Sequence, residues 1–362
     1  MKSLKILAWA MVILSLCACE SDEGSRDFDK EVLLKDLATN IIVPSYTQFS
    51  DASSSFLNAT VTFTETPQED NLIALQAEWV KMTNSWASIE MVDLGPVAIN
   101  YFRTYISRWP LTETALIEEA INTTETIDET YVSNQGSTRK GLHAIEYLIF
   151  DQDNDHQKII DAFADPNRGL YLKALAQNLV TISTQMSNDW SNTYQAEFIE
   201  KIGNGIGTSV NDLANNIIVF AENIKNKKLG APLGKGSLTQ ELAPDLVESP
   251  YSKTSVEQLK ENLTSLKLYF EGNGGTGLAK LIDFSTENTE NHQLSEKIIS
   301  QIEGIITLLD GFNTPLFTAV ENQQLEQSNE LYTEMENLIR LLKSDMMSAL
   351  SLTLTFSDND GD

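Results

Sequence analysis

Hydrophobic residues recur at intervals of three and four along most of the chain, the spacing that places them on one face of a helix. The segment that begins at residue 71 illustrates the pattern, since its apolar positions form one continuous stripe: Leu72, Leu75, Trp79, Met82, Trp86 and Ile89. Similar stripes run through 172–190, 198–224, 256–270, 298–309 and 331–350. The pattern predicts a long amphipathic helix in each of these segments.

Signals for β-strands are scarce. Only the short β-branched runs at 59–64 and 350–356 resemble strands, and both adjoin segments with helical spacing. Gly95-Pro96 and the glycine- and proline-rich segment 229–236 mark the ends of helices. We therefore expect an all-α fold built from antiparallel helices.

A faint internal repeat refines this expectation. At a near-constant offset that recurs at several places, Gly95-Pro96 falls on Ala231-Pro232. Chance alignment between amphipathic helices is the alternative explanation. The repeat predicts two related helical bundles produced by internal duplication, at residues 29–166 and 167–356, followed by an acidic tail at 357–362.

The N-terminus has the pattern of a processing signal. Two lysines precede an apolar run at residues 6–16, which has the length of a signal-peptide core and is too short for a mature membrane span. The run ends in Leu16-Cys17-Ala18-Cys19, which resembles a bacterial lipobox. We expect residues 1–18 to be removed, Cys19 to be lipidated, and residues 19–28 to form a polar tether. Cleavage as an ordinary secreted protein is the alternative.

The signal predicts where the protein is located and that its mature domain is stabilised without disulfides. The membrane partner would be reached through the lipid on Cys19, in the cell envelope of a Gram-negative bacterium. An acidic stretch directly after the cysteine is similar to the surface-export signal of some Bacteroidetes lipoproteins, so the outer-membrane anchor would face either the periplasm or the exterior. Both cysteines lie in the signal region, so we expect no disulfide in the mature domain.

The charge limits the partners. The formal net charge is −27, and removal of the signal lysines makes it more negative. Such a surface repels the phosphates of nucleic acids, so we expect no nucleic-acid partner. It is compatible with cations or with basic partners.

Candidate chemistry gathers at the stretch "GLHAIEYLIF". His143, one of only three histidines, lies three residues before Glu146, so the two side chains share one helix face. Gly141 has no side chain beside them and would let another backbone or a ligand approach. Imidazole and carboxylate form half of a zinc or iron site, and further donors must come from other helices. A buried His–Glu hydrogen bond is the alternative.

The same stretch resembles the Gly-x-His-x-x-Glu signature of the imelysin family. Other landmarks agree, including Trp86 with Glu90, the turn at Gly95-Pro96, "RWP" at 108–110 and "ESPYS" at 248–252. The resemblance implies an all-helical fold of two related bundles, with a site around the signature residues. It also suggests Glu90 as a further metal donor, whereas an ion pair with Arg103 or Arg139 is the alternative for that residue.

The resemblance implies two possible functions, and a third stays open beside them. The first is a cell-envelope lipoprotein, associated with iron acquisition, that binds a divalent metal (iron or zinc) or a small ligand at His143 and Glu146. The second is a metallopeptidase in which Glu146 acts as general base on metal-bound water, although no second histidine stands at helical spacing. The third is a non-enzymatic surface protein that binds a protein or glycan. Whether the protein is an enzyme stays open at this point.

Overall fold

The computed structural model describes residues 27–111 and 113–356. Over these residues the chain forms helices and no strand, which confirms the all-α expectation. Residues 59–64, one of the two runs that resembled a strand, lie inside α3 (Val43–Glu65). Within the described part, no helix is long and apolar enough to cross a bilayer. The predicted signal peptide, Cys19 and the acidic tail lie outside the described residues.

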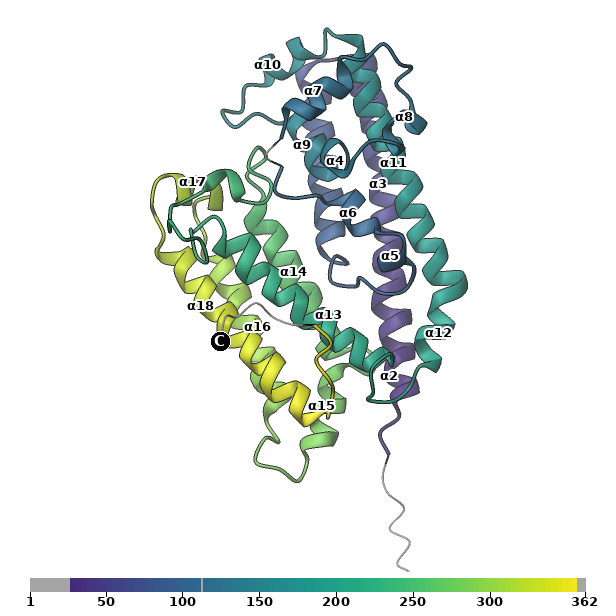
Figure 1. Ribbon diagram of the computed structural model, residues 1–362, viewed down its shortest axis with the longest axis vertical. Coiled ribbons are helices and arrows are strands. Elements are labelled where there is room, and N and C mark those ends of the chain that lie inside the picture. The colour runs from purple at the N-terminus through teal and green to yellow at the C-terminus, as the bar shows by residue number, and fades with distance from the viewer. Residues whose placement is uncertain (1–26, 112, 357–362) are drawn as a thin grey trace, which may run out of the picture.

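A first bundle is built on three long helices that run side by side (Figure 1). They are α3, α4 (Glu69–Ala87) and α11 (Pro166–Asp189). Hydroxyl pairs join α3 to α11, with Thr47 Oγ1 3.3 Å from Ser187 Oγ and Ser50 Oγ 3.1 Å from Thr184 Oγ1. At the N-terminal end, α2 (Lys30–Leu37) leads through the π-helical turn η1 (Ala38–Ile42) into α3.

Short helices between α4 and α11 cover one face of this bundle. They are α5 (Pro96–Ile99), α6 (Phe102–Ile106), α7 (Ala115–Ile121), α8 (Glu129–Ser133), the 3₁₀ turn η2 (Ser137–Arg139), α9 (Leu142–Ile149) and α10 (His156–Ala162). The candidate motif lies on α9, so its position is set by this irregular layer. Loops and short helices of this kind carry functional residues more often than long helices do.

A second bundle follows, formed by the helices after residue 208. Its elements are α13 (Ser209–Asn223), η4 (Ile224–Gly230), η5 (Pro244–Leu246), α14 (Ser255–Glu271), α15 (Leu278–Thr286), α16 (Leu294–Asp310), α17 (Leu316–Glu321), α18 (Glu326–Arg340), η6 (Leu341–Met346) and α19 (Met347–Ala349). Helix α14 packs against α4 and so brings the two bundles together.

The predicted division at residues 166 and 167 stays a prediction, and the packing of the helix that begins there bears on it. Helix α11 starts there, yet it packs against α3, α8 and α9 of the first bundle. The chain passes to the second bundle only after η3 (Trp190–Tyr194) and α12 (Gln195–Glu200), which packs on α2. The internal duplication itself stays a prediction.

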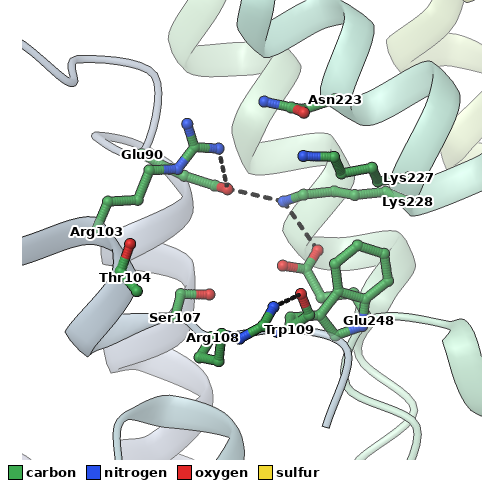
Figure 2. A pocket seen from close by; sticks show the side chains of 10 residues that line it. All are labelled: Glu90, Arg103, Thr104, Ser107, Arg108, Trp109, Asn223, Lys227, Lys228 and Glu248. Atoms are coloured by element: carbon green, nitrogen blue, oxygen red, sulfur yellow. Dashed lines mark hydrogen bonds and ion pairs between the residues drawn. The ribbon is translucent and has the colours of Figure 1, made fainter. Parts of the chain in front are cut away.

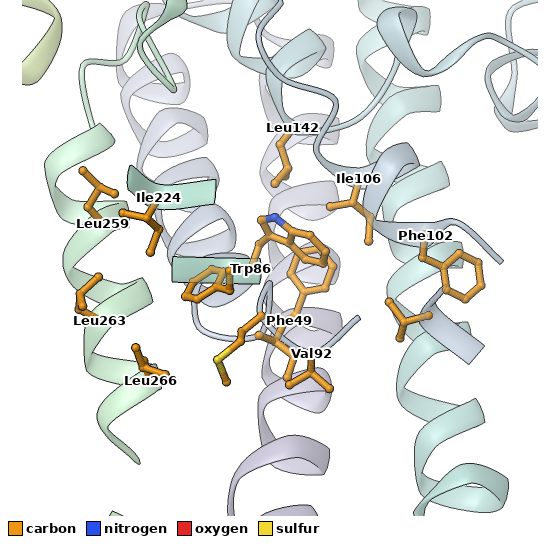
Figure 3. Close-up of a cluster of buried hydrophobic side chains, with 14 of the residues drawn as sticks. Phe49, Trp86, Val92, Phe102, Ile106, Leu142, Ile224, Leu259, Leu263 and Leu266 are labelled. Atoms are coloured by element: carbon orange, nitrogen blue, oxygen red, sulfur yellow. The ribbon is translucent and has the colours of Figure 1, made fainter. Parts of the chain in front are cut away.

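One apolar core extends across the junction of the bundles. Trp86 of α4 lies against Phe49 of α3, with ring centroids 5.3 Å apart. Figure 3 shows Leu259 and Leu263 of α14 on the other side of this cluster. All of these side chains are buried. The junction that holds the candidate site is therefore a packed interface, and apolar burial stabilises it.

Candidate functional site

The backbone at Gly141 positions the motif helix. Its φ is +84°, a value that side chains other than glycine rarely adopt, and a Cβ there would lie 2.3 Å from the carbonyl oxygen of Ile106. Glycine thus lets the start of α9 press directly against the end of α6. This close approach brings the first turn of α9 next to Ser107, which follows α6.

His143 lies in that first turn and is only 4% exposed. Its Nε2 atom lies 3.1 Å from Ser107 Oγ. Its Nδ1 atom lies 3.7 Å from Glu146 Oε2 and has no hydrogen-bond partner among the described residues. The structure therefore brings His143 and Glu146 together on one helix face, as their spacing predicts, and adds a serine that the sequence did not indicate.

Glu146 fastens the second bundle to the first. Its Oε1 atom accepts hydrogen bonds from the backbone N–H of Tyr251 at 3.1 Å, the backbone N–H of Ser252 at 2.8 Å and the Ser252 hydroxyl at 2.8 Å. The carboxylate is 1% exposed, so these bonds replace water. Burial, followed by Tyr147 and Glu146, raises the pKa of Tyr251 to about 12. One oxygen of the signature carboxylate is thus saturated by the "ESPYS" segment.

Glu90 lies between two cations (Figure 2). Its Oε1 atom accepts from Arg103 at 3.1 Å and its Oε2 atom from Lys228 at 2.8 Å. Burial alone raises the pKa of Glu90, but the Lys228 ammonium and the Arg103 guanidinium outweigh burial and lower that pKa to about 2. The ion pair with Arg103, which was one of the two explanations for Glu90, is confirmed.

Lys228 extends this charge network across the junction. Its Nζ atom contacts Glu90 of the first bundle and also lies 2.9 Å from Glu248 Oε2 and 3.0 Å from Asn262 Oδ1. The side chain is buried, which lowers its pKa, yet the carboxylates of Glu248 and Glu90 outweigh burial and raise the pKa above that of a free lysine. The ammonium group stays charged and holds the two carboxylates together.

A pocket of about 340 Å³ opens beside this network. Figure 2 shows its lining, which comes from both bundles: Glu90, Arg103, Thr104, Ser107, Arg108, Trp109, Asn223, Lys227, Lys228 and Glu248. A much smaller cavity of about 10 Å³ adjoins it and is lined by Glu90, Ser107 and His143, among others. The two cavities share Glu90, Ser107, Lys228 and Glu248, so two of the three predicted metal donors, His143 and Glu90, line adjoining spaces.

The predicted metal donors are engaged otherwise in this arrangement. Glu90 is paired with two cations, and Glu146 directs one oxygen to three donors of the second bundle. Within residues 27–111 and 113–356, no group of three or more histidine, cysteine, aspartate or glutamate side chains is placed to hold a metal ion. Arranged in this way, the side chains do not fit a resident metal ion. Iron or zinc at His143, Glu146 and Glu90 stays a prediction.

The sequence did not indicate several residues of the pocket. Ser107 precedes the "RWP" landmark, Arg108 is its first residue, and Glu248 is the first residue of "ESPYS". The sequence thus indicated these segments as family landmarks but did not predict that their side chains line a pocket. Lys228 had no signal at all. It belongs to a lysine-rich stretch that is typical of a solvated helix face, and the structure buries it.

Fold and site together define an all-helical protein of two joined bundles, with a charged pocket at their junction. A profile of the imelysin family (peptidase M75) matches residues 42–342. The chain therefore belongs to the imelysin family, as its signature stretch predicted. No curated protein matches the chain.

Solved structures have the same fold. An imelysin-like protein from Psychrobacter arcticum 273-4 aligns with a TM-score of 0.74 and 18% identity, over 91% of this chain and 99% of that one. A protein from Parabacteroides distasonis ATCC 8503, assigned as an iron-regulated protein A precursor, aligns with a TM-score of 0.74 and 16% identity, over 91% and 97%. At these identities the likeness establishes the fold alone.

Proposed function

We propose that this protein is an imelysin-type cell-envelope lipoprotein that binds a small anionic ligand in the pocket between its bundles, as part of iron acquisition. The charge of the pocket carries the proposal. Four cationic and only two carboxylate side chains line it, in a chain whose net charge is −27. A locally cationic hollow in an acidic protein favours an anionic ligand over a bare cation.

The pairing inside the pocket identifies the charges that a ligand would meet. Lys228 and Arg103 are held by the carboxylates of Glu90 and Glu248. In the part of the chain that is described, no carboxylate lies within ion-pair distance of Arg108 or Lys227, and both side chains are exposed. These two cations are the groups that would attract and hold an anion.

Iron would then arrive as cargo in an anionic chelate and not as a bare ion on protein ligands. This form reconciles the link to iron, drawn from the resemblance and from the description of the Parabacteroides protein, with side chains that do not gather as a metal-ligand set. The pocket volume of about 340 Å³ suits a small chelate and is too small for a folded partner.

The first test is calorimetric titration of the purified protein with ferric citrate, with citrate alone and with ferric chloride. We expect the chelate to bind, and Arg108→Gln with Lys227→Gln to weaken binding at least about tenfold, because two favourable charge contacts are lost. A matched control, Lys81→Gln with Lys158→Gln, removes the same charge from two exposed lysines outside the pocket. Equal loss in both double variants would refute a specific anion site.

The same samples test the metal-site prediction. Metal content is measured by mass spectrometry after exposure to iron or zinc salts, for the parent, His143→Ala and Glu146→Gln. Stoichiometric metal that both substitutions remove would support the site at His143, Glu146 and Glu90 and the metallopeptidase alternative. His156→Ala is the control, because His156 also faces a carboxylate, Glu69, but on the exposed surface.

The lipoprotein part of the proposal is tested separately. It is supported by the Leu16-x-Ala18-Cys19 pattern, which lies outside the described residues. Cys19→Ala should move the protein from the outer-membrane fraction to the soluble fraction or leave it unprocessed, while the fold is unaffected. Proteolysis of intact cells then distinguishes a surface-facing from a periplasmic protein.

A further inference from the structure

Three side chains at the pocket, Ser107, His143 and Glu146, lie one after another within contact distance, and the metal hypothesis leaves Ser107 without a role. Ser107 Oγ lies 3.1 Å from His143 Nε2, and His143 Nδ1 lies 3.7 Å from Glu146 Oε2. A hydroxyl, an imidazole and a carboxylate in this order are the parts of an activated serine nucleophile, in which the imidazole removes the proton and the carboxylate orients the ring.

We propose that Ser107 is a nucleophile, that His143 is its general base, and that the pocket cleaves a small ester that carries negative charge. The charge of the substrate rests on the proposed function above, whereas the reacting groups rest on the contacts alone. Ser107 lines both the larger and the smaller cavity, so its hydroxyl stands at the place where a ligand would be held.

Glu146 is a positioning residue in this arrangement. Its Oε1 atom is fixed by the three donors of Tyr251 and Ser252, which leaves Oε2 directed to the imidazole. His143 is 4% exposed, and its Nδ1 atom lacks a hydrogen-bond partner among the described residues. A buried polar atom without a partner requires an explanation. A general base provides one, because the ring becomes charged when Nε2 receives a proton, and the Glu146 carboxylate beside Nδ1 then stabilises that charge.

The reaction balances without any co-reactant except water. The Ser107 proton passes to His143 Nε2 as Oγ bonds to the ester carbonyl carbon, and the carbonyl electron pair moves onto oxygen. Collapse of this intermediate breaks the bond to the leaving alkoxide, which takes the proton from His143. Water then attacks the acyl-serine with His143 as base again, which releases the acid and restores Ser107. Cationic side chains such as Lys228 line the same space and favour the developing negative charge.

A fluorophosphonate probe tests the nucleophile directly. In the full-length protein, the Ser107 oxygen should displace fluoride from phosphorus, and intact-mass and peptide analysis should locate one adduct on Ser107. We expect Ser107→Ala to abolish the adduct and His143→Ala to slow its formation at least about 100-fold, the range of general-base catalysis. The controls Ser45→Ala and His156→Ala should label at the parent's rate, because both residues lie outside this pocket.

Other outcomes overturn the proposal. An adduct that is absent, that lies on another serine, or that forms equally fast in a folded His143→Ala variant excludes an activated Ser107. Glu146→Gln should change the pH profile of labelling and not only its extent, which a purely structural carboxylate would not do. Hydrolysis of p-nitrophenyl succinate compared with p-nitrophenyl acetate then tests the preference for an anionic ester.

This test and that of the proposed function fail in different ways. If ferric citrate binding depends on Arg108 and Lys227 but Ser107 takes no adduct, the pocket binds without catalysis and only this inference falls. If Ser107 is labelled but no anion binds, the nucleophile stands and the anionic substrate does not.

Discussion

The buried carboxylate of Glu90 offers a quantitative test of the junction. Glu90→Gln replaces a charge that Arg103 and Lys228 hold at 3.1 and 2.8 Å with a neutral group of the same shape. A pKa lowered from 4.5 to about 2 corresponds to about 3 kcal/mol of folded-state preference for the charged form, at about 1.4 kcal/mol per unit. We expect the substitution to reduce the free energy of unfolding by about that amount at pH 7.

The pH dependence gives the sign of the effect. The folded-state pKa of Glu90 is depressed, so its stabilisation is complete above the unfolded value of 4.5 and is lost as the pH falls through about 2. The difference between parent and Glu90→Gln should therefore be constant from pH 7 to about 5. It should fall to roughly half by pH 3, because Glu90 is then almost fully protonated in the unfolded chain but still mostly charged in the folded protein.

Urea unfolding of both proteins, followed by circular dichroism between pH 3 and pH 7, measures this difference. Glu119→Gln is the control, since Glu119 makes an ion pair with Arg139 at 2.9 Å but is 64% exposed, and such pairs contribute at most about 1 kcal/mol. Lys228→Met should cost about 3–5 kcal/mol, because it leaves Glu90 and Glu248 buried together. A cost below about 1 kcal/mol for Glu90→Gln at pH 7, or one that does not change by pH 3, would refute the reasoning.

Two further predictions concern the motif helix. Gly141→Ala should destabilise the protein by at least about 2 kcal/mol, because a Cβ would lie 2.3 Å from the Ile106 carbonyl oxygen and a φ of +84° is strained for alanine. Thermal melting measures the effect, with Gly136→Ala as the control, because a Cβ at Gly136 has no neighbour within 4 Å. Glu146→Gln should reduce the free energy of unfolding by about 1–3 kcal/mol and increase proteolysis next to Ser252, because the amide keeps one acceptor but loses the charge. Limited proteolysis with mass analysis tests this, and unchanged cleavage would contradict a role of Glu146 in holding the Ser252 segment.

The helices were predictable because helical periodicity is a local property. The apolar stripe from Leu72 to Trp86 lies on α4, Ile89 follows just after the end of that helix, and all members of the stripe are buried. The placement of His143 and Glu146 on one face was predictable for the same reason, since a spacing of three fixes it on any helix. The bond from Glu146 to Ser252, 106 residues away, is a tertiary contact that no local pattern encodes.

The start of α11 shows what a local signal encodes and what it does not. Pro166 begins a helix, and the Asp165 side chain accepts from the N–H of Asn167 as an N-cap. Where that helix packs depends on its partners, and α11 lies against α3. A helix start is encoded within a few residues, whereas membership of a bundle is decided by apolar faces far apart in the chain.

The signature glutamate connects the stability of the junction with its chemistry. One oxygen of Glu146 holds the segment that carries Glu248, and Glu248 contacts the same ammonium group, that of Lys228, as Glu90 does. The other oxygen faces His143, and through it Ser107 at the pocket. A change in the bonds between Glu146 and the segment of Tyr251 and Ser252 therefore alters both the positions of the charges that line the pocket and the orientation of the imidazole. Glu146 would be required in a binding protein and in a hydrolase alike, so only the reactivity of Ser107 separates the two.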